Sequence, residues 1–324
     1  MNVLLINPNN RIAAPFAAIE PPLWLGMMAS YYEELGNNVF ILDAEAEGLP
    51  LDQTINAATL PWADEVIIVV MGNNPSVSST PKMAGVESLL EWIPKAKVFG
   101  LHPSAVQHPQ RITIPLDKTW KVAWDLLPMS KYRAHNWHCL NDLDKRSPYG
   151  VLYTSLNCPF DCFYCNVHAL YGDRIVRHRP HKNIWEDLRY FADHGIRNIK
   201  IWDELFCLDV HKVEAICEYI EAFGFDFNIW AYARVDTVTK GMLAKMKKAG
   251  INWLSYGFES ASDGVRAKAR KHFANDVMLA SMIMTRDAGI NINANFLFGL
   301  PGDTEDDMKF TYDFACAFNF EYVN

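Results

Sequence analysis

The chain has 324 residues and a net charge of −8, and half of its residues are apolar while about a fifth are charged. This is ordinary globular composition with enough length for two domains, and no basic block indicates a nucleic-acid-binding face. Neither a signal peptide nor a membrane span is indicated, because the longest apolar run, Val66 to Met71, is far shorter than the roughly 20 residues that cross a bilayer. Seven cysteines without a regular framework argue against a secreted disulfide protein, so we expect a cytoplasmic protein.

The first domain is predicted to cover residues 1–120 and to alternate strands with helices. Uniformly apolar strands are expected at 3–6, 39–43, 65–71 and 97–100, with helices at 22–36 and 81–92. Such strands are typical of a parallel sheet covered on both faces, so we expect a doubly wound, flavodoxin- or Rossmann-like α/β fold. Ligands bind such sheets at the carboxyl ends of the strands. The loops there are either a binding site or ordinary turns, and their candidate contact residues are Asn9, Asn73, Ser76 and His102.

A compact cysteine motif follows the apolar run at residues 151–153. Cys158, Cys162 and Cys165 are spaced C-x3-C-x2-C. A tight loop of this kind can direct three thiolates to one iron–sulfur cube and leave one iron open for a substrate molecule. Zinc is the alternative, since His168 would complete a Cys3His set, although zinc ligands usually come as two pairs separated by a longer loop. Cysteines packed without any metal would suit a loop so rich in turn residues poorly.

After a linker at 121–148, the second domain is predicted to span residues 149–324 and to repeat a strand–helix unit. Beyond the cysteine loop, strands are expected at 199–202, 228–236, 253–260, 292–302 and 320–324, with helices at 183–194, 210–223, 240–249, 275–288 and 304–318. Such repeats suit right-handed crossovers and a parallel, barrel-like sheet, here a partial (β/α)6 barrel that looks truncated in strand six. Reactive residues of barrels lie at the strand C-termini. The polar or glycine-rich ends here carry Asp203, Glu204, Arg234, Glu259, Ser260 and Gly299.

The cysteine spacing, with Tyr164 directly before the last cysteine, resembles the radical S-adenosylmethionine (SAM) superfamily. The resemblance covers residues from about 149 to the end, including the run Phe-Leu-Phe-Gly-Leu-Pro-Gly-Asp-Thr at 296–304. The first domain resembles the cobalamin-binding domain that precedes many of these enzymes. The matching pieces are the strand–Asn–Pro start, the Pro-Pro-Leu-x-Leu-Gly helix and the Gly-x-His-Pro turn at 100–103, although the cobalamin signature Asp-x-His-x-x-Gly is absent.

The resemblance implies a set of cofactor contacts. The three cysteines would hold a [4Fe–4S] cluster whose open iron binds SAM. The residues implied to contact SAM are Tyr164, Asp203, Glu204, Arg234, Glu259, Ser260, Gly299 and Leu300. Those implied to contact cobalamin are Asn9, Asn73, Ser76 and His102.

The activity that the resemblance implies is reductive cleavage of SAM to a 5′-deoxyadenosyl radical, which abstracts hydrogen from an unactivated carbon. Cobalamin would add methylation of that carbon. Without cobalamin, the alternative is radical rearrangement, ring closure or epimerisation, and the alternative from another class is a non-catalytic, zinc-bearing docking protein. The implied partners are a small-molecule or biosynthetic-intermediate substrate and an electron donor such as flavodoxin or ferredoxin. The sequence does not indicate which substrate is used.

Overall fold

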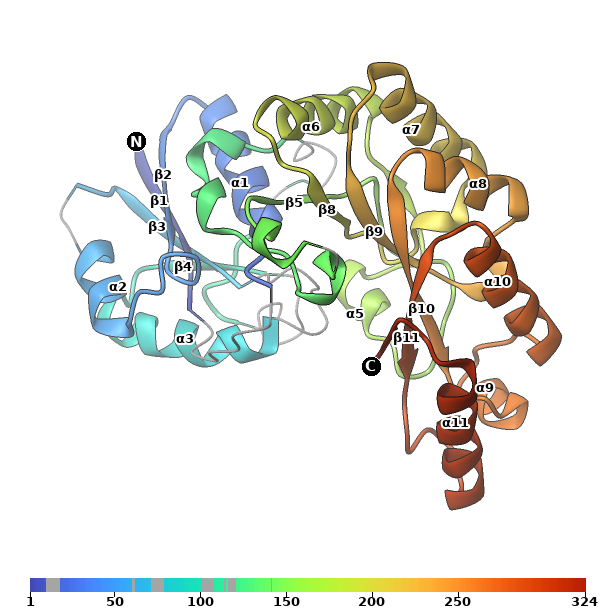
Figure 1. Cartoon of the computed structure of the whole chain (residues 1–324). Coiled ribbons are helices and arrows are strands. Elements are labelled where there is room, and N and C mark those ends of the chain that lie inside the picture. Colours follow the sequence, from blue (N-terminus) through green and yellow to red (C-terminus); the bar gives the residue numbers. More distant parts are fainter. Residues whose placement is uncertain are drawn as a thin grey trace. The chain divides into compact units, whose positions relative to one another are not determined.

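The chain forms two compact units in the computed structural model, which describes residues 1–9, 18–59, 62–70, 79–100, 108–113, 115, 121–140 and 142–324 (Figure 1). The first unit comprises residues 1–151, 169–173 and 179–187, and the second comprises residues 152–168, 174–178 and 188–324. Among the described residues, no helix has both the length and the apolar character needed to cross a membrane.

The first unit contains a parallel four-stranded sheet. Its strands are β1 (Asn2–Asn7), β2 (Asn38–Asp43), β3 (Glu65–Val69) and β4 (Lys97–Phe99), in the order β2-β1-β3-β4. Ile6 pairs with Leu42 on one side and with Ile68 on the other, all in parallel register. The predicted strands and their parallel arrangement are therefore confirmed.

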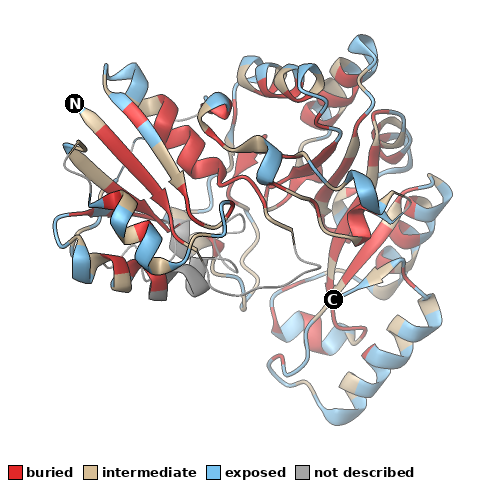
Figure 2. Cartoon of the chain, turned by 60° about the vertical axis from the view of Figure 1, so that its left-hand side comes forward, coloured by how far each residue is buried: buried red, intermediate tan, exposed pale blue. Residues whose placement is uncertain are grey.

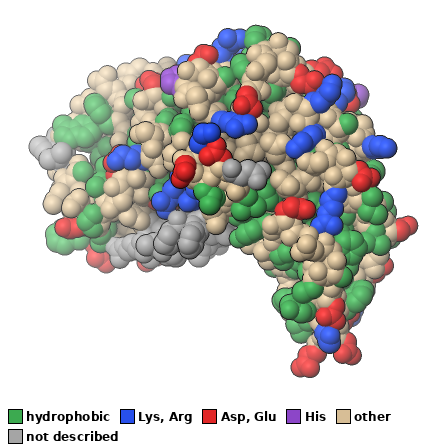
Figure 3. Space-filling model, viewed as in Figure 1, with side chains coloured by type: hydrophobic (Ala, Val, Ile, Leu, Met, Phe, Trp, Pro, Cys, Tyr) green, Lys and Arg blue, Asp and Glu red, His purple; other side chains and the backbone are tan. Residues whose placement is uncertain are grey.

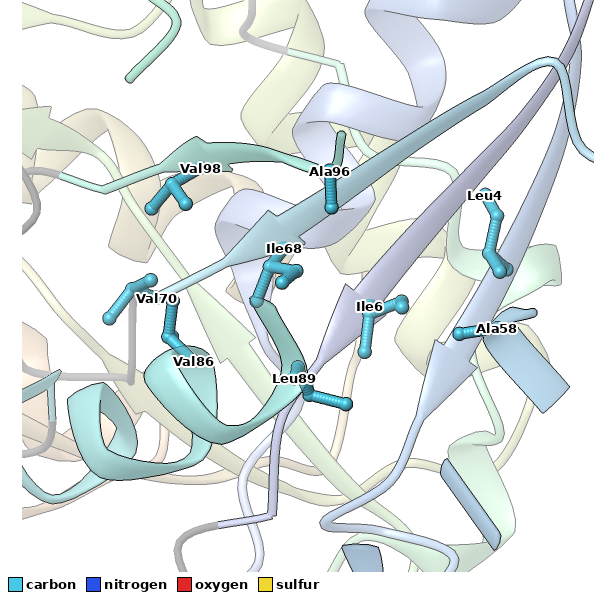
Figure 4. Packing of buried hydrophobic residues seen from close by; sticks show 9 residues of the cluster. All are labelled: Leu4, Ile6, Ala58, Ile68, Val70, Val86, Leu89, Ala96 and Val98. Atoms are coloured by element: carbon cyan, nitrogen blue, oxygen red, sulfur yellow. The ribbon is translucent and has the colours of Figure 1, made fainter. Parts of the chain in front are cut away.

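Helices cover both faces of this sheet. On one face, α2 (Leu51–Ala58) and α3 (Ser79–Trp92) pack on β1, β3 and β4 in a buried cluster (Figure 4). On the other face, Trp24 of α1 (Leu23–Glu34) contacts Phe99, with ring centroids 5.9 Å apart. The sequence did not predict α2, because this short segment holds few apolar residues. Covering on both faces explains why the strands are uniformly apolar.

The segment after the sheet is irregular and forms short 3-10 turns at 124–126, 129–131, 137–139 and 143–145. Two buried hydrogen bonds fix it within the first unit. The hydroxyl of Tyr132 donates to Asp43 at 2.7 Å, and the indole N–H of Trp124 donates to Asp187 at 2.8 Å. Asp187 lies on α6 (His181–Asp193).

A six-stranded sheet has its strands in chain order, β5-β8-β9-β10-β11-β12, and the strands β8 to β12 form the centre of the second unit. Neighbouring strands from β8 to β12 are parallel. The strands are β5 (Tyr149–Leu152), β8 (Asn198–Ile201), β9 (Asn228–Ala233), β10 (Ile251–Glu259), β11 (Asn291–Phe296) and β12 (Tyr322–Val323). The connecting helices are α7 (Val210–Phe223), α8 (Lys240–Lys248), α10 (Asn275–Asp287) and α11 (Glu305–Phe318). The predicted partial barrel is confirmed, and its strands are mostly buried (Figure 2).

Smaller elements of the second unit were not predicted. The antiparallel pair β6 (Ser155–Leu156) and β7 (Arg177–His178) flanks the cysteine loop. Two short helices, α5 (Val167–Tyr171) and α9 (Asp263–Lys268), interrupt the regular repeat. In the view of Figure 3, side chains of both charge signs are interspersed over the described residues.

Candidate functional site

A buried polar network fixes the chain just before the cysteine loop. The carboxylate of Asp203, which follows β8, accepts hydrogen bonds from the backbone N–H and the hydroxyl of Thr154. It also accepts one from the Ser155 hydroxyl at 2.6 Å and pairs with the Lys212 ammonium of α7 at 3.0 Å. Asp203 is fully buried. Its described partners therefore occupy the carboxylate, which positions the loop rather than facing a ligand.

The entry to the loop is a tight turn at Asn157. This residue has a φ of +77°, a left-handed conformation that asparagine tolerates better than most residues. Its backbone N–H donates to Glu204 at 2.9 Å, and its side-chain oxygen accepts from the N–H of Cys158 at 2.8 Å. The Nε2 atom of His168 lies 2.8 Å from the carbonyl oxygen of Cys158. These bonds direct the first cysteine away from β6.

All three cysteines of the motif are free thiols, and Cys165 is exposed while Cys158 and Cys162 are partly buried. Burial first, and then the neighbouring Cys165 and Cys162, raise the pKa of Cys158 to about 11. Burial also raises the pKa of Cys165. The three sulfurs are thus close enough to affect one another electrostatically, and they lie on one short loop. Three unpaired thiols of this kind fit the ligand set of an iron–sulfur cube with one open iron.

Arg234, at the end of β9, lies against the loop. One guanidinium nitrogen is 3.8 Å from the sulfur of Cys162, and the guanidinium carbon lies 4.1 Å from the ring centre of Phe160. Other guanidinium nitrogens bond to Asp236 at 2.7 Å and to the carbonyl oxygen of His272 at 2.9 Å. The structure therefore brings the guanidinium of Arg234 within hydrogen-bond distance of a cysteine sulfur.

A second cluster joins the loop to the end of β10. Glu259, with a φ of +65°, pairs with the Lys271 ammonium at 2.8 Å, and both side chains are buried. Burial and then the negative charge of Glu259 raise the pKa of Tyr164, so the phenol stays protonated. Gly257 borders this pair closely, because a Cβ atom there would lie 2.4 Å from a Glu259 oxygen and 2.6 Å from the Lys271 nitrogen.

The remaining predicted SAM contacts divide into two groups. Leu300 packs with Tyr164 in a small cluster with Val265 and Ala269, as expected for a shared apolar wall. Ser260 is instead buried toward α11, with its hydroxyl 3.1 Å from that of Thr311. Gly299 is exposed, has a φ of +78°, and its N–H donates to Asp303 at 2.9 Å.

The first unit offers an apolar cavity at its strand ends. The cavity has a volume of about 330 Å³ and includes Asn9 and Gly85 in its lining, together with Pro8, Leu49, Pro50, Leu51, Thr54 and Leu89. The side-chain amide of Asn9 donates to the carbonyl oxygen of Leu49 at 3.1 Å. Asn73, Ser76 and His102 lie outside the described residues.

Sequence reasoning missed Lys212 and Lys271, which are buried cations beside the site. Both act through partners that lie far away along the chain or across a turn, so no local motif marks them. The orientation of Asp203, in contrast, could have been predicted from the alternation of residues along its strand. Asp203 continues the alternation of Ile199 and Ile201, which places all three on the helix-covered face of the sheet.

The chain resembles known proteins over both units. Residues 152–315 match the family model of the Radical SAM superfamily. All of the chain aligns at 25% identity with an uncharacterized methyltransferase of Pyrococcus horikoshii and covers 79% of it. About half of the chain, 53%, is 26% identical to a putative methylthiotransferase of Methanocaldococcus jannaschii, of which it covers 41%.

Two solved structures share the fold. The radical SAM methyltransferase TsrM of Kitasatospora setae, with cobalamin and a [4Fe–4S] cluster bound, matches 99% of this chain and 74% of its own with a TM-score of 0.77 and 14% identity. The cobalamin-dependent radical enzyme OxsB, with aqua-cobalamin bound, matches 97% of this chain with a TM-score of 0.69 and 16% identity. This chain spans only 51% of OxsB. The predicted combination of a cobalamin-domain fold with a radical SAM fold is thereby confirmed.

The family match covers half of the chain and contains all three cysteines of the motif. The protein therefore belongs to the radical SAM superfamily and is an enzyme whose cofactors are a [4Fe–4S] cluster and S-adenosylmethionine.

Proposed function

We propose that this enzyme holds its cluster on Cys158, Cys162 and Cys165 and methylates an unactivated carbon of a small molecule with the help of cobalamin. The observation that carries the first part is the loop itself. Buried hydrogen bonds fix its backbone through Asp203 and Glu204, while its thiols stay free. The methyl-transfer part is supported by the names of the relatives and by the titles of the similar structures.

The side chains around the loop have distinct tasks in this proposal. The cluster, when bound, supplies the electron that splits SAM into methionine and a 5′-deoxyadenosyl radical. Arg234 donates a hydrogen bond to the sulfur of Cys162 and thereby holds the loop against the end of β9. Tyr164 and Leu300 form an apolar wall for the adenine, and the buried Glu259–Lys271 ion pair lies beside Tyr164. A flavodoxin or ferredoxin would deliver the electron.

The titles of the two similar structures, which have cobalamin bound, support cobalamin as a ligand of the first unit. At about 330 Å³ the cavity is far too small for a whole corrinoid, but it suits one apolar ring system of a ligand. Its position after β1 is where parallel sheets bind ligands. Gly85 keeps the cavity open, since a side chain there would meet the backbone oxygen of Asn9 at 3.3 Å.

The two alternatives differ in support. Radical chemistry without cobalamin uses the same cysteine loop, so only the first unit separates it from the proposal. A zinc site is not supported by the contacts of its fourth ligand, because the Nε2 atom of His168 lies 2.8 Å from a backbone oxygen.

The cluster assignment is tested by anaerobic reconstitution of the full chain with iron, sulfide, SAM and dithionite. We expect about four irons per chain and formation of 5′-deoxyadenosine. A preparation with that iron content that never forms 5′-deoxyadenosine would contradict the proposal, and zinc without sulfide would favour the docking protein.

Cobalamin is tested by absorbance of the protein purified after growth with the vitamin. A retained corrin band supports methylation, and its absence favours rearrangement, ring closure or epimerisation. Gly85→Leu, which fills the cavity, should lower the retained corrin and leave the iron content unchanged. Glu87→Leu, an exposed change on the same helix, is the matched control.

A further inference from the structure

The sheet of the second unit has one face covered by helices and one inner face turned away from them. Hydrogen bonds identify the helix-covered face, since Asp203 reaches Lys212 of α7 and the Tyr256 hydroxyl lies 2.9 Å from that of Thr285 on α10. Successive side chains of a strand point to opposite faces. Trp202 and Ser255, each one residue before these two, therefore lie on the inner face.

The strand register places four inner-face residues in one row. Ile201 pairs with Ala231, which puts Trp202 level with Tyr232, and Tyr232 pairs with Ser255. Ser255 in turn pairs with Asn293. The side-chain amide of Asn295 donates to the Ser255 hydroxyl at 2.9 Å, which confirms that β10 and β11 present these residues to the same side.

A buried lysine lies directly next to this row. The ammonium of Lys200 is 4.5 Å from the ring centre of Trp230, 5.5 Å from that of Tyr232 and 5.6 Å from that of Trp202. Lys200 is only 4% exposed. Aromatic faces stabilise a desolvated ammonium, so the rings allow a positive charge to persist on the inner face.

Two buried polar atoms of the row lack a hydrogen-bond partner among the described residues. They are the indole N–H of Trp202 and the side-chain oxygen of Asn293, and each of these residues is 3% exposed. A buried polar atom without a partner destabilises the fold, so such an atom points to a missing ligand or water. The two have opposite character, because the indole can only donate and the amide oxygen can only accept.

The geometry points to a substrate-binding site on this inner face. It is made by Lys200 and by two members of the row, Trp202 and Asn293. The ligand class that it fits is a ring-bearing small acid with an O–H or N–H group at its other end. The acidic oxygens accept from the Lys200 ammonium and the Trp202 indole, the ring stacks beside Trp230 and Tyr232, and the distal donor reaches Asn293. Strands β8 and β11 are three spacings apart, so the two ends of the ligand are separated by at most about 14 Å.

This inference rests on the proposed function, whose substrate it describes, but its test needs neither cluster nor SAM. The probe is 4-hydroxyphenylacetate, with the neutral 4-hydroxyphenylacetamide as its matched control, titrated calorimetrically into the full chain at up to about 10 mM ligand. We expect the acid to bind about 10-fold more tightly than the amide. Failure here would leave formation of 5′-deoxyadenosine intact, whereas failure of the proposed function would leave this binding intact.

Variants of Lys200, Trp202 and Asn293 test whether these residues bind the acid. Lys200→Met should remove the preference for the acid, and Trp202→Phe and Asn293→Ala should each weaken binding of the acid about 3-fold or more. Phenylacetate, which has no distal hydroxyl, should be insensitive to Asn293→Ala. Lys309→Met, on the exposed face of α11, is the control.

Three outcomes would each overturn the proposal: equal binding of acid and amide, no binding of either, or a preference for the acid that survives Lys200→Met. The two unpartnered atoms would then be assigned to water. If Lys200→Met does not fold, the comparison of acid with amide in the unaltered chain and in Trp202→Phe decides the question.

Discussion

Each unit has a buried aspartate at the end of a strand, but the hydrogen-bond donors around the two aspartates differ. Asp203 follows β8 and Asp43 ends β2, and both carboxylates are buried and bonded by several donors. Around Asp203 one of the donors is the cation of Lys212. Asp43 accepts hydrogen bonds from three neutral groups: the amide of Asn7 at 2.7 Å, the N–H of Ala46 at 3.0 Å and the hydroxyl of Tyr132 at 2.7 Å.

This difference matches what each carboxylate supports. The ion pair in the second unit fixes the base of a short loop whose thiols must hold one geometry. The neutral network in the first unit holds the irregular segment around Tyr132 against the sheet, next to strands whose ends border an apolar cavity. A rigid base suits metal ligands, whereas an apolar cavity selects by shape and needs no charged anchor.

The largest effect should come from the thiols themselves. Cys162→Ala removes one of three ligands and the sulfur next to Arg234, so we expect iron content near background and 5′-deoxyadenosine formation lowered by at least about 100-fold. Cys316→Ala, an exposed cysteine on α11, should change neither. Iron analysis and product quantification measure both, and normal cluster content in Cys162→Ala would contradict the assignment.

Removing each aspartate tests whether the charge in its network matters. Asp203→Ala leaves the Lys212 ammonium buried without its carboxylate, which should lower the free energy of unfolding by about 3–5 kcal/mol. Asp43→Ala removes the acceptor of the three neutral donors named above, so a smaller loss of about 1–3 kcal/mol is expected. Urea unfolding measures the loss of stability in both variants. Equal losses would show that the buried Lys212 cation adds nothing to the cost of removing the carboxylate.

The Tyr132 hydroxyl provides a pH test of the neutral network. Burial, and then the negative charge of Asp43, raise the pKa of Tyr132 well above its ordinary value of 10.0. The folded state therefore holds this proton more tightly than the unfolded state. Its contribution is complete below pH 10 and is lost as pH rises beyond that value.

Tyr132→Phe should accordingly cost about 1.5–3 kcal/mol at pH 8, because a hydrogen bond to a charged group is removed. Its difference from the unaltered chain should shrink above pH 10, the ordinary tyrosine value. Urea midpoints measured on both proteins at pH 8 and at several pH values above 10 give the comparison. A difference that stays constant with pH would contradict the assigned role of the hydroxyl.

The sequence predicted the parts of each unit that depend on local patterns. Apolar runs gave the strands of both sheets, and spacing gave the cysteine loop. The short helices α2 and α9 were missed because few apolar residues mark them. The polar networks were missed because their members meet only after folding: Thr154 and Asp203, for instance, lie 49 residues apart. Alternation along β8 would have placed Asp203 on the helix side, whereas its strand-end position and the resemblance to the radical SAM superfamily suggested a SAM contact.

The smallest expected effect concerns Gly257, which tests whether the Glu259–Lys271 pair is held as firmly as the Asp203 network. A Cβ atom there would come within 2.6 Å of both charged groups, so Gly257→Ala must displace them. We expect a loss of about 1–3 kcal/mol in stability and weaker SAM binding. Gly241→Ala is the matched control, because nothing lies within 4 Å of its added Cβ in α8, and it should stabilise the helix slightly. Calorimetric titration of SAM into both reconstituted variants separates the outcomes. If Gly257→Ala binds SAM normally, the Glu259–Lys271 pair can shift without weakening SAM binding. The rigidly held part of the second unit would then be limited to the cysteine loop and the Asp203 network.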